Sequence, residues 1–170
     1  NLENLLQKNF NMNVVRSLIF KSLKIKKKFI EIDEFDKGPR LILNYGHTFG
    51  HAIEKITNYK IPHGMAVAHG INMSNFFSLQ YKFINKKIFE EIECQMGKIV
   101  DLSELKKINA MHFLEIVKKD KKNKKNQIRL ILTKGFGKMF MKNFSNNLEF
   151  ISLLKKYFLY IANFKMTSSR

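Results

Sequence analysis

The stretch LNYGHTFGHAIE, residues 43 to 54, decides the fold. Its polar residues Asn44, His47, His51 and Glu54 are spaced three, four and three residues apart, so a helix through the stretch would place them on one face. An apolar core would leave an amide, two imidazoles and a carboxylate without partners, which costs free energy. The spacing therefore predicts a helix whose polar face contacts a polar, anionic ligand.

Apolar residues recur at helical spacing along most of the chain, and glycine or proline separates the periodic segments. QIRLIL and GKMFMK read instead as two short strands, joined by the glycine-containing turn TKGFG. The sequence therefore predicts a mainly α fold with one small β-hairpin. The expected helices cover residues 13–30, 40–56, 63–81, 86–97, 103–119 and 146–162.

Two of these helices begin at residues that favour N-caps. Asp101 or Ser103 is the expected cap of the helix at 103–119. Asn146 is the expected start of the last helix, because Glu149 follows three residues later in the manner of a capping box.

The composition limits the classes of protein to which this chain can belong. Its 170 residues match the length of one domain, which we expect to span residues 1–170. No apolar run reaches the roughly 20 residues of a membrane span, and no secretory signal opens the chain. Cys94 is the single cysteine, which excludes an internal disulfide, and we interpret it as a small buried residue. We therefore expect a cytoplasmic protein with no membrane partner.

The net charge of +17, from 31 basic and 14 acidic residues, raises the hypothesis of nucleic-acid binding. The lysine runs KIKKK and KKDKKNKK lack the interleaved aromatic residues of a single-strand binding surface. Such runs are more typical of solvated faces and loops. A noncatalytic nucleic-acid-binding protein is therefore kept only as an alternative.

Two histidines from adjacent helices can supply half of a tetrahedral zinc site. His47 and His63 can meet in this way, because one expected helix carries His47 and the next begins at His63. His47 and His51 form another pair, one turn apart. That second pair is a weak candidate, since the zinc-protease pattern needs a glutamate where this chain has Thr48.

The stretches DEFDKGPRLILNYGHTFGHAIE and IPHGMAVAHGINM closely resemble the C-terminal, metal-binding domain of 3-dehydroquinate synthases and their sugar-phosphate cyclase relatives. The resemblance is dense from Lys26 to Met73 and continues more thinly through KKDKKNKKNQIRLIL. It implies that His47 and His63 are zinc ligands. It also implies that Asn44 and His51 contact the substrate phosphate and take part in catalysis.

The resemblance assigns further residues to the substrate. Lys26 and Arg40 match basic substrate-binding positions, and a guanidinium suits bidentate capture of a carboxylate. Lys121 or Lys122 matches a lysine that reaches the phosphate, and spacing does not decide between them. Glu54 also lies in the motif, and we interpret it as an orienting or structural residue.

The resemblance implies a phosphate-eliminating lyase of the shikimate pathway, in aromatic amino acid biosynthesis. In such enzymes NAD transiently oxidises a ring hydroxyl of 3-deoxy-arabino-heptulosonate 7-phosphate, phosphate is eliminated, and ring opening with aldol closure yields 3-dehydroquinate. Zinc, with cobalt as the alternative, acts as a Lewis acid. Met65 stands where these enzymes usually carry glutamate, so a related cyclase acting on another sugar phosphate remains an alternative.

The family also places an α/β nucleotide-binding domain, and a glutamate that is the third zinc ligand, upstream of the matching region. We therefore expect this chain to be the C-terminal part of a larger enzyme, with NAD bound mainly by the absent domain. We expect the larger enzyme to be a homodimer, and the isolated chain to be inactive.

Overall fold

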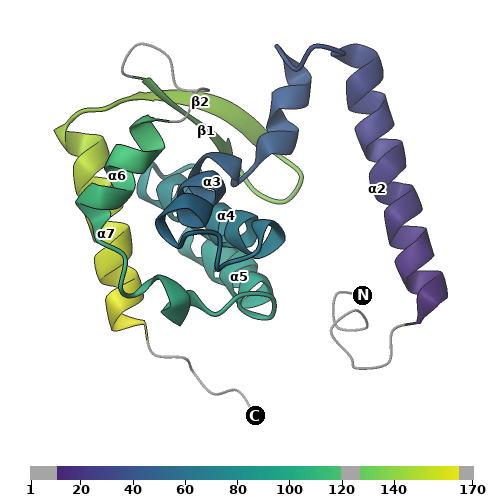
Figure 1. Cartoon of the computed structure of the whole chain (residues 1–170). Helices are drawn as coiled ribbons and strands as arrows, with labels where there is room; N and C mark the ends of the chain where they lie inside the picture. The colour runs from purple at the N-terminus through teal and green to yellow at the C-terminus, as the bar shows by residue number, and fades with distance from the viewer. Residues whose placement is uncertain (1–10, 120–126, 165–170) are drawn as a thin grey trace. The chain divides into compact units, whose positions relative to one another are not determined.

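The computed structural model describes residues 11–119 and 127–164. The chain divides into two compact units, residues 1–43 and residues 44–170, and each is described by itself. Figure 1 shows a largely helical chain with a single two-stranded hairpin in its described parts. The predicted mainly α fold with one β-hairpin is therefore confirmed.

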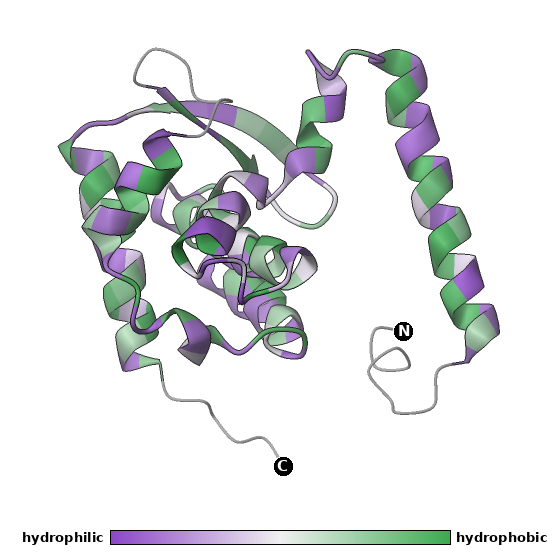
Figure 2. Ribbon diagram, in the orientation of Figure 1, coloured by the Kyte–Doolittle hydropathy of each residue, from purple (hydrophilic) through white to green (hydrophobic). Residues whose placement is uncertain are grey.

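The first unit contains α2 (Met12–Ile32) and most of the 3-10 helix η1 (Pro39–Asn44). Hydrophobic and hydrophilic residues are interleaved along α2 (Figure 2). After the helix, the Asp33 carboxylate accepts hydrogen bonds from the backbone N–H groups of Lys37 at 3.0 Å, Gly38 at 2.7 Å and Arg40 at 3.2 Å. These donors, with Lys37 foremost, lower the pKa of Asp33. The carboxylate thus shapes the turn that leads into η1.

The predicted continuous helix at 40–56 is wrong. The chain forms η1 up to Asn44, turns at Gly46, and begins α3 (His47–Ile56) at His47. Gly46 has φ +77°, and a Cβ there would lie 2.6 Å from the Val67 carbonyl oxygen. A left-handed backbone that touches a neighbouring helix requires glycine, so Asn44 is not on the helical face that carries His47.

Helix α4 (His63–Gln80) packs directly against α3. A Cβ at Gly70 would lie 2.0 Å from the Gly46 carbonyl oxygen, and one at Gly50 would lie 3.1 Å from the Ala66 carbonyl oxygen. Gly46 and Gly50 therefore both meet the first half of α4, where the absence of side chains lets the two helix backbones touch. We call these contacts of Gly46, Gly50 and Gly70 the glycine seam.

The fully buried Phe49 fixes α3 in the aromatic core. Its ring centroid lies 5.3 Å from that of Phe77 on α4 and 6.2 Å from that of Phe113. Thr48 Oγ1 also donates to the Arg129 carbonyl oxygen at 2.8 Å. Helix α3 is thus held by its neighbours on several sides, as Figure 1 shows.

The remaining elements surround α3 and α4 or pack beside them. Strands β1 (Gln127–Thr133) and β2 (Met139–Ser145) are antiparallel, with Gln127 opposite Ser145 and Thr133 opposite Met139. The elements are α5 (Lys86–Gly97), η2 (Leu102–Leu105), α6 (Ala110–Lys118), β1 (Gln127–Thr133), β2 (Met139–Ser145) and α7 (Leu148–Asn163).

Three further expectations are corrected. The predicted helix at 103–119 is split into η2 and α6, because the Asn109 side chain caps a new helix by accepting from the N–H groups of Met111 and His112. The cap of α7 is Asn147 rather than Asn146. Cys94 is exposed rather than buried. None of the helices in the described ranges is long and apolar enough to cross a membrane.

Side-chain caps distinguish the helices. Asn or Asp side chains cap α2, η2, α5, α6 and α7. In contrast, α3 begins after Gly46 and α4 after Pro62, and no side chain of the described residues caps either one. The first-turn N–H groups of these two helices therefore rely on other partners.

Candidate functional site

Three imidazoles gather where α3 and α4 begin. His47 is the first residue of α3, His51 lies one turn later, and His63 is the first residue of α4. The ring centroids are 5.6 Å apart for His47 and His51, 5.5 Å for His47 and His63, and 5.9 Å for His51 and His63. We call this group the histidine cluster.

The loop between α3 and α4 brings His63 to this position. Asn58 and Tyr59 have φ +50° and +59°, and the Tyr59 N–H donates to the Glu54 carbonyl oxygen at 2.7 Å. Ile61 is buried and anchors the returning chain. Pro62, with φ −60° and ψ 150°, then directs the chain into α4.

The segment before His47 is also fixed to α4. Burial raises the pKa of the Tyr45 hydroxyl, so this group remains protonated and donates to Asn75 Oδ1. His47 Nδ1 lies 3.2 Å from the Tyr45 carbonyl oxygen. A carbonyl can only accept, so this bond requires a proton on Nδ1 and leaves the lone pair of neutral His47 on Nε2.

Glu54 joins the cluster from the last part of α3. Its Oε1 lies 3.2 Å from His63 Nδ1. The candidate ligand atoms of His51, Glu54 and His63 all lie within 4.8 Å of one another. Imidazole nitrogen and carboxylate oxygen are both common zinc ligands, so the donors present fit a metal of this kind. That His47 and His63 are the ligands stays a prediction.

The other predicted site residues are placed as follows. Asn44 ends η1 and is half-buried. In the unit of residues 1–43, Lys26 is exposed on α2, and Arg40 Nη1 donates to the Glu34 carbonyl oxygen at 2.7 Å. Lys121 and Lys122 lie outside the described residues. The substrate-binding roles of all these residues, and that of His51, stay predictions.

The two uncapped helix starts suit an anion. A helix N-terminus carries partial positive charge and N–H groups without helical acceptors, and it commonly binds phosphate or carboxylate. His47 opens α3 and His63 opens α4. The same region of the fold thus offers side chains of the kinds that bind metals and two helix starts of the kind that suits an anion.

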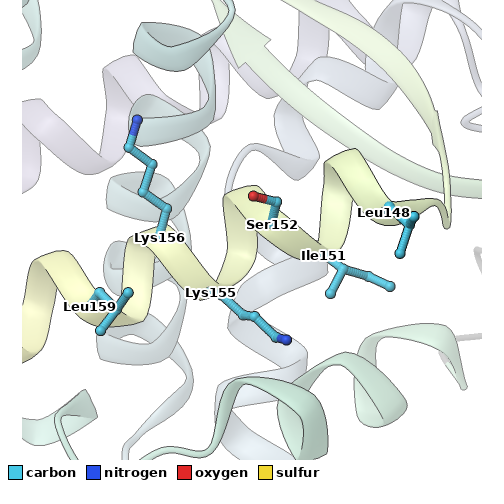
Figure 3. Close-up of a pocket in the computed structure, with 6 residues that line it drawn as sticks. All are labelled: Leu148, Ile151, Ser152, Lys155, Lys156 and Leu159. Atoms are coloured by element: carbon cyan, nitrogen blue, oxygen red, sulfur yellow. The ribbon is translucent and has the colours of Figure 1, made fainter.

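Three features lie apart from this chemistry. A hollow of about 380 Å³ is lined entirely by α7 residues and contains none of the predicted site residues (Figure 3). His69 is fully buried on α4, with Nε2 2.8 Å from Glu104 Oε2, and burial lowers its pKa although Glu104 raises it. Met65 is half-buried against the core, which suits a packing role.

The fold and the site define a helical domain in which three histidines gather at the starts of two helices that have no side-chain cap. The family model described as 3-dehydroquinate synthase C-terminal matches residues 1–123, and the chain belongs to this family. The resemblance found in the sequence is therefore confirmed.

Curated relatives agree with this family. The chain is 38% identical over 151 residues to the 3-dehydroquinate synthase of Campylobacter concisus, which covers 88% of this chain and 44% of that protein. It is 39% identical over 124 residues to that of Helicobacter pylori strain P12, covering 72% and 36%. The enzyme from Pelagibacter ubique is 38% identical over 151 residues, covering 84% and 40%. The chain thus spans less than half the length of these relatives.

Solved structures share the fold. A crystal structure of 2-deoxy-scyllo-inosose synthase matches with TM-score 0.56 and 22% identity, over 74% of this chain and 34% of that chain. Another, complexed with carbaglucose-6-phosphate, NAD+ and Co2+, matches with TM-score 0.59 and 22% identity, over 73% and 34%. At this identity the likeness concerns the fold alone.

Proposed function

We propose that this chain is the metal- and substrate-binding part of a 3-dehydroquinate synthase. Its reaction would convert 3-deoxy-arabino-heptulosonate 7-phosphate to 3-dehydroquinate with release of phosphate. The observation that carries the proposal is the histidine cluster at two uncapped helix starts. The family and the named relatives support the choice of reaction.

His47 and His63 would hold the metal, which we propose to be zinc, with cobalt as the alternative. The Nδ1 bond of His47 to a carbonyl supports this role, since it leaves Nε2 as the donor atom. When bound, the metal supplies a Lewis acid beside the reacting hydroxyl. NAD, which supplies the transient oxidation, would be held mainly by a part of the enzyme beyond this chain.

The anionic groups of the substrate would be bound by this chain's own residues. His51 and Asn44 offer imidazole and amide donors for the phosphate, and the helix starts of α3 and α4 add positive potential. Lys26 and Arg40 would bind the carboxylate, because a guanidinium can pair with both of its oxygens. Lys121 or Lys122 would add a further charge to the phosphate site.

The test uses the polypeptide as its own gene encodes it. Metal content is measured first, and then phosphate release from 3-deoxy-arabino-heptulosonate 7-phosphate with NAD and zinc. We expect both the bound metal and the release of phosphate to be lost in His47→Ala and after chelation. His112→Ala is the matched control, because His112 is exposed on α6 and outside the histidine cluster.

The outcomes separate the alternatives. Zinc binding without phosphate release from this substrate, but with release from another sugar phosphate, would favour a related cyclase. Failure of the wild-type chain to bind zinc would refute His47 and His63 as ligands. Affinity for nucleic acid that falls steeply with salt and ignores chelators would favour the basic binding protein instead.

A further inference from the structure

We propose that Glu54 is the positioning residue of His63. Its carboxylate would accept a hydrogen bond from the Nδ1–H of His63, so that the lone pair of the neutral ring lies on Nε2 and is presented to the metal. This inference rests on the proposed function, because it concerns the orientation of a proposed metal ligand. It assigns Glu54 to one particular histidine and one particular tautomer.

The carboxylate of Glu54 is more deeply buried than the imidazole that it would orient. The Glu54 and His63 side chains are 13% and 57% exposed, and the atoms that join them are 3.2 Å apart. The Glu54 carbonyl oxygen also accepts from Tyr59 N–H at 2.7 Å and from Thr57 Oγ1 at 3.3 Å. Both the backbone and the side chain of Glu54 are thus engaged, and the exposed imidazole takes its orientation from this sheltered carboxylate.

The bond of His47 gives an internal comparison. His47 Nδ1 meets the Tyr45 carbonyl oxygen at 3.2 Å, and His63 Nδ1 meets Glu54 Oε1 at the same distance. Metal-binding histidines commonly donate one ring N–H to a carbonyl or a carboxylate, which fixes the tautomer and orients the ring. The two proposed ligands therefore use the same ring nitrogen with different acceptors, and both leave Nε2 for the metal.

A competing role for Glu54 is direct coordination. Its oxygen belongs to the same group of candidate ligand atoms as those of His51 and His63. The two roles predict different effects of Glu54→Gln. An amide oxygen can still accept from Nδ1, so a positioning role survives this change in large part. A carboxylate ligand would be lost.

The experiment uses the full chain with ¹⁵N-labelled histidine. In the metal-free protein, two-bond ¹H–¹⁵N NMR above the titration range of imidazole reports the tautomer of His63. We expect the Nδ1–H form in the wild type and in Glu54→Gln, and a shift toward the Nε2–H form in Glu54→Ala. Glu91→Ala, at an exposed position of α5, is the control and should keep the wild-type tautomer.

Metal affinity provides the second measurement. Zinc binding, measured by chelator competition, should weaken about 10–100-fold in Glu54→Ala and less in Glu54→Gln. The visible spectrum of bound Co2+ should keep its shape in Glu54→Gln, because the coordinating atoms are unchanged. Far-UV circular dichroism of each variant confirms that it is folded.

Three results would be decisive in different ways. An unchanged His63 tautomer in Glu54→Ala would overturn the proposal. Loss of metal binding with an altered Co2+ spectrum in Glu54→Gln would also overturn it, in favour of direct coordination. A wild type that binds no metal, but whose His63 tautomer depends on Glu54, would refute the proposed metal site and still support the positioning of His63.

Discussion

A methyl group at position 70 should force α3 and α4 apart. In Gly70→Ala the new Cβ would lie 2.0 Å from the Gly46 carbonyl oxygen and 2.8 Å from the Gly50 nitrogen. Ordinary van der Waals contact begins at 3.4 Å, so the nearer pair is 1.4 Å too close. Both neighbouring atoms belong to the backbone, so no side-chain rotation can relieve the clash, and the helices themselves must move.

The expected cost follows from the packing. Overpacking of a well-packed interior costs about 1–3 kcal/mol, and separation of the helices also loosens the contacts of the buried Phe49. We expect the free energy of unfolding to fall by about 3 kcal/mol, the upper end of that range. The movement displaces His47 and His51 relative to His63, so zinc affinity should fall with it.

Urea unfolding of the full chain, followed by circular dichroism with linear extrapolation, measures this loss. Gly64→Ala is the matched control, because it lies in the same helix and its Cβ would meet nothing within 4 Å. Alanine's helix propensity should leave that variant as stable as the wild type, or more stable by up to about 1 kcal/mol. Equal unfolding midpoints for Gly70→Ala and Gly64→Ala would refute the importance of the glycine seam.

Two further predictions concern the core. Burial lowers the pKa of His69 below its unfolded value, so the unfolded chain binds its proton first, and the free energy of unfolding should fall as pH drops below about 6.5. His69→Gln should reduce this fall in denaturation curves at several pH values, and an identical pH dependence would contradict the reasoning. Phe49→Ala should destabilise by about 3–5 kcal/mol in the same assay. The exposed Phe136→Ala should change stability by less than about 0.5 kcal/mol, and similar losses in the two variants would count against the aromatic core.

Most helices could be predicted from the sequence, because apolar residues recur at helical spacing within them and glycine or proline marks where they end. The prediction failed at Gly46, where the spacing of Asn44, His47 and His51 is the same whether the helix is continuous or interrupted. Only the packing of Gly46 against α4, which the local sequence does not contain, imposes the left-handed backbone. The break before α6 was missed for a related reason, since apolar spacing continues across the residues where Asn109 starts a new helix.

The approach of His47 to His63 could be predicted, because the two expected helices are adjacent and share a short loop. The contact of Glu54 with His63 could not be predicted, since it depends on the left-handed backbone of Asn58 and Tyr59 in that loop. The uncapped start of α3 was also missed, because the predicted helix began earlier, at Arg40. A glycine followed by histidine, with no Ser, Thr, Asp or Asn in the cap position, was the available signal.

The glycine seam bears on how this sequence can change over time. Elsewhere in the core one apolar side chain can replace another of similar size at modest cost, and this chain uses 16 phenylalanines. The seam does not tolerate such replacements, since its closest contacts are to backbone atoms and it admits no larger residue at Gly46 or Gly70. A bias toward particular amino acids can therefore replace many residues of the surface and the core while the distances between the imidazoles stay the same. A single substitution in the glycine seam would change those distances.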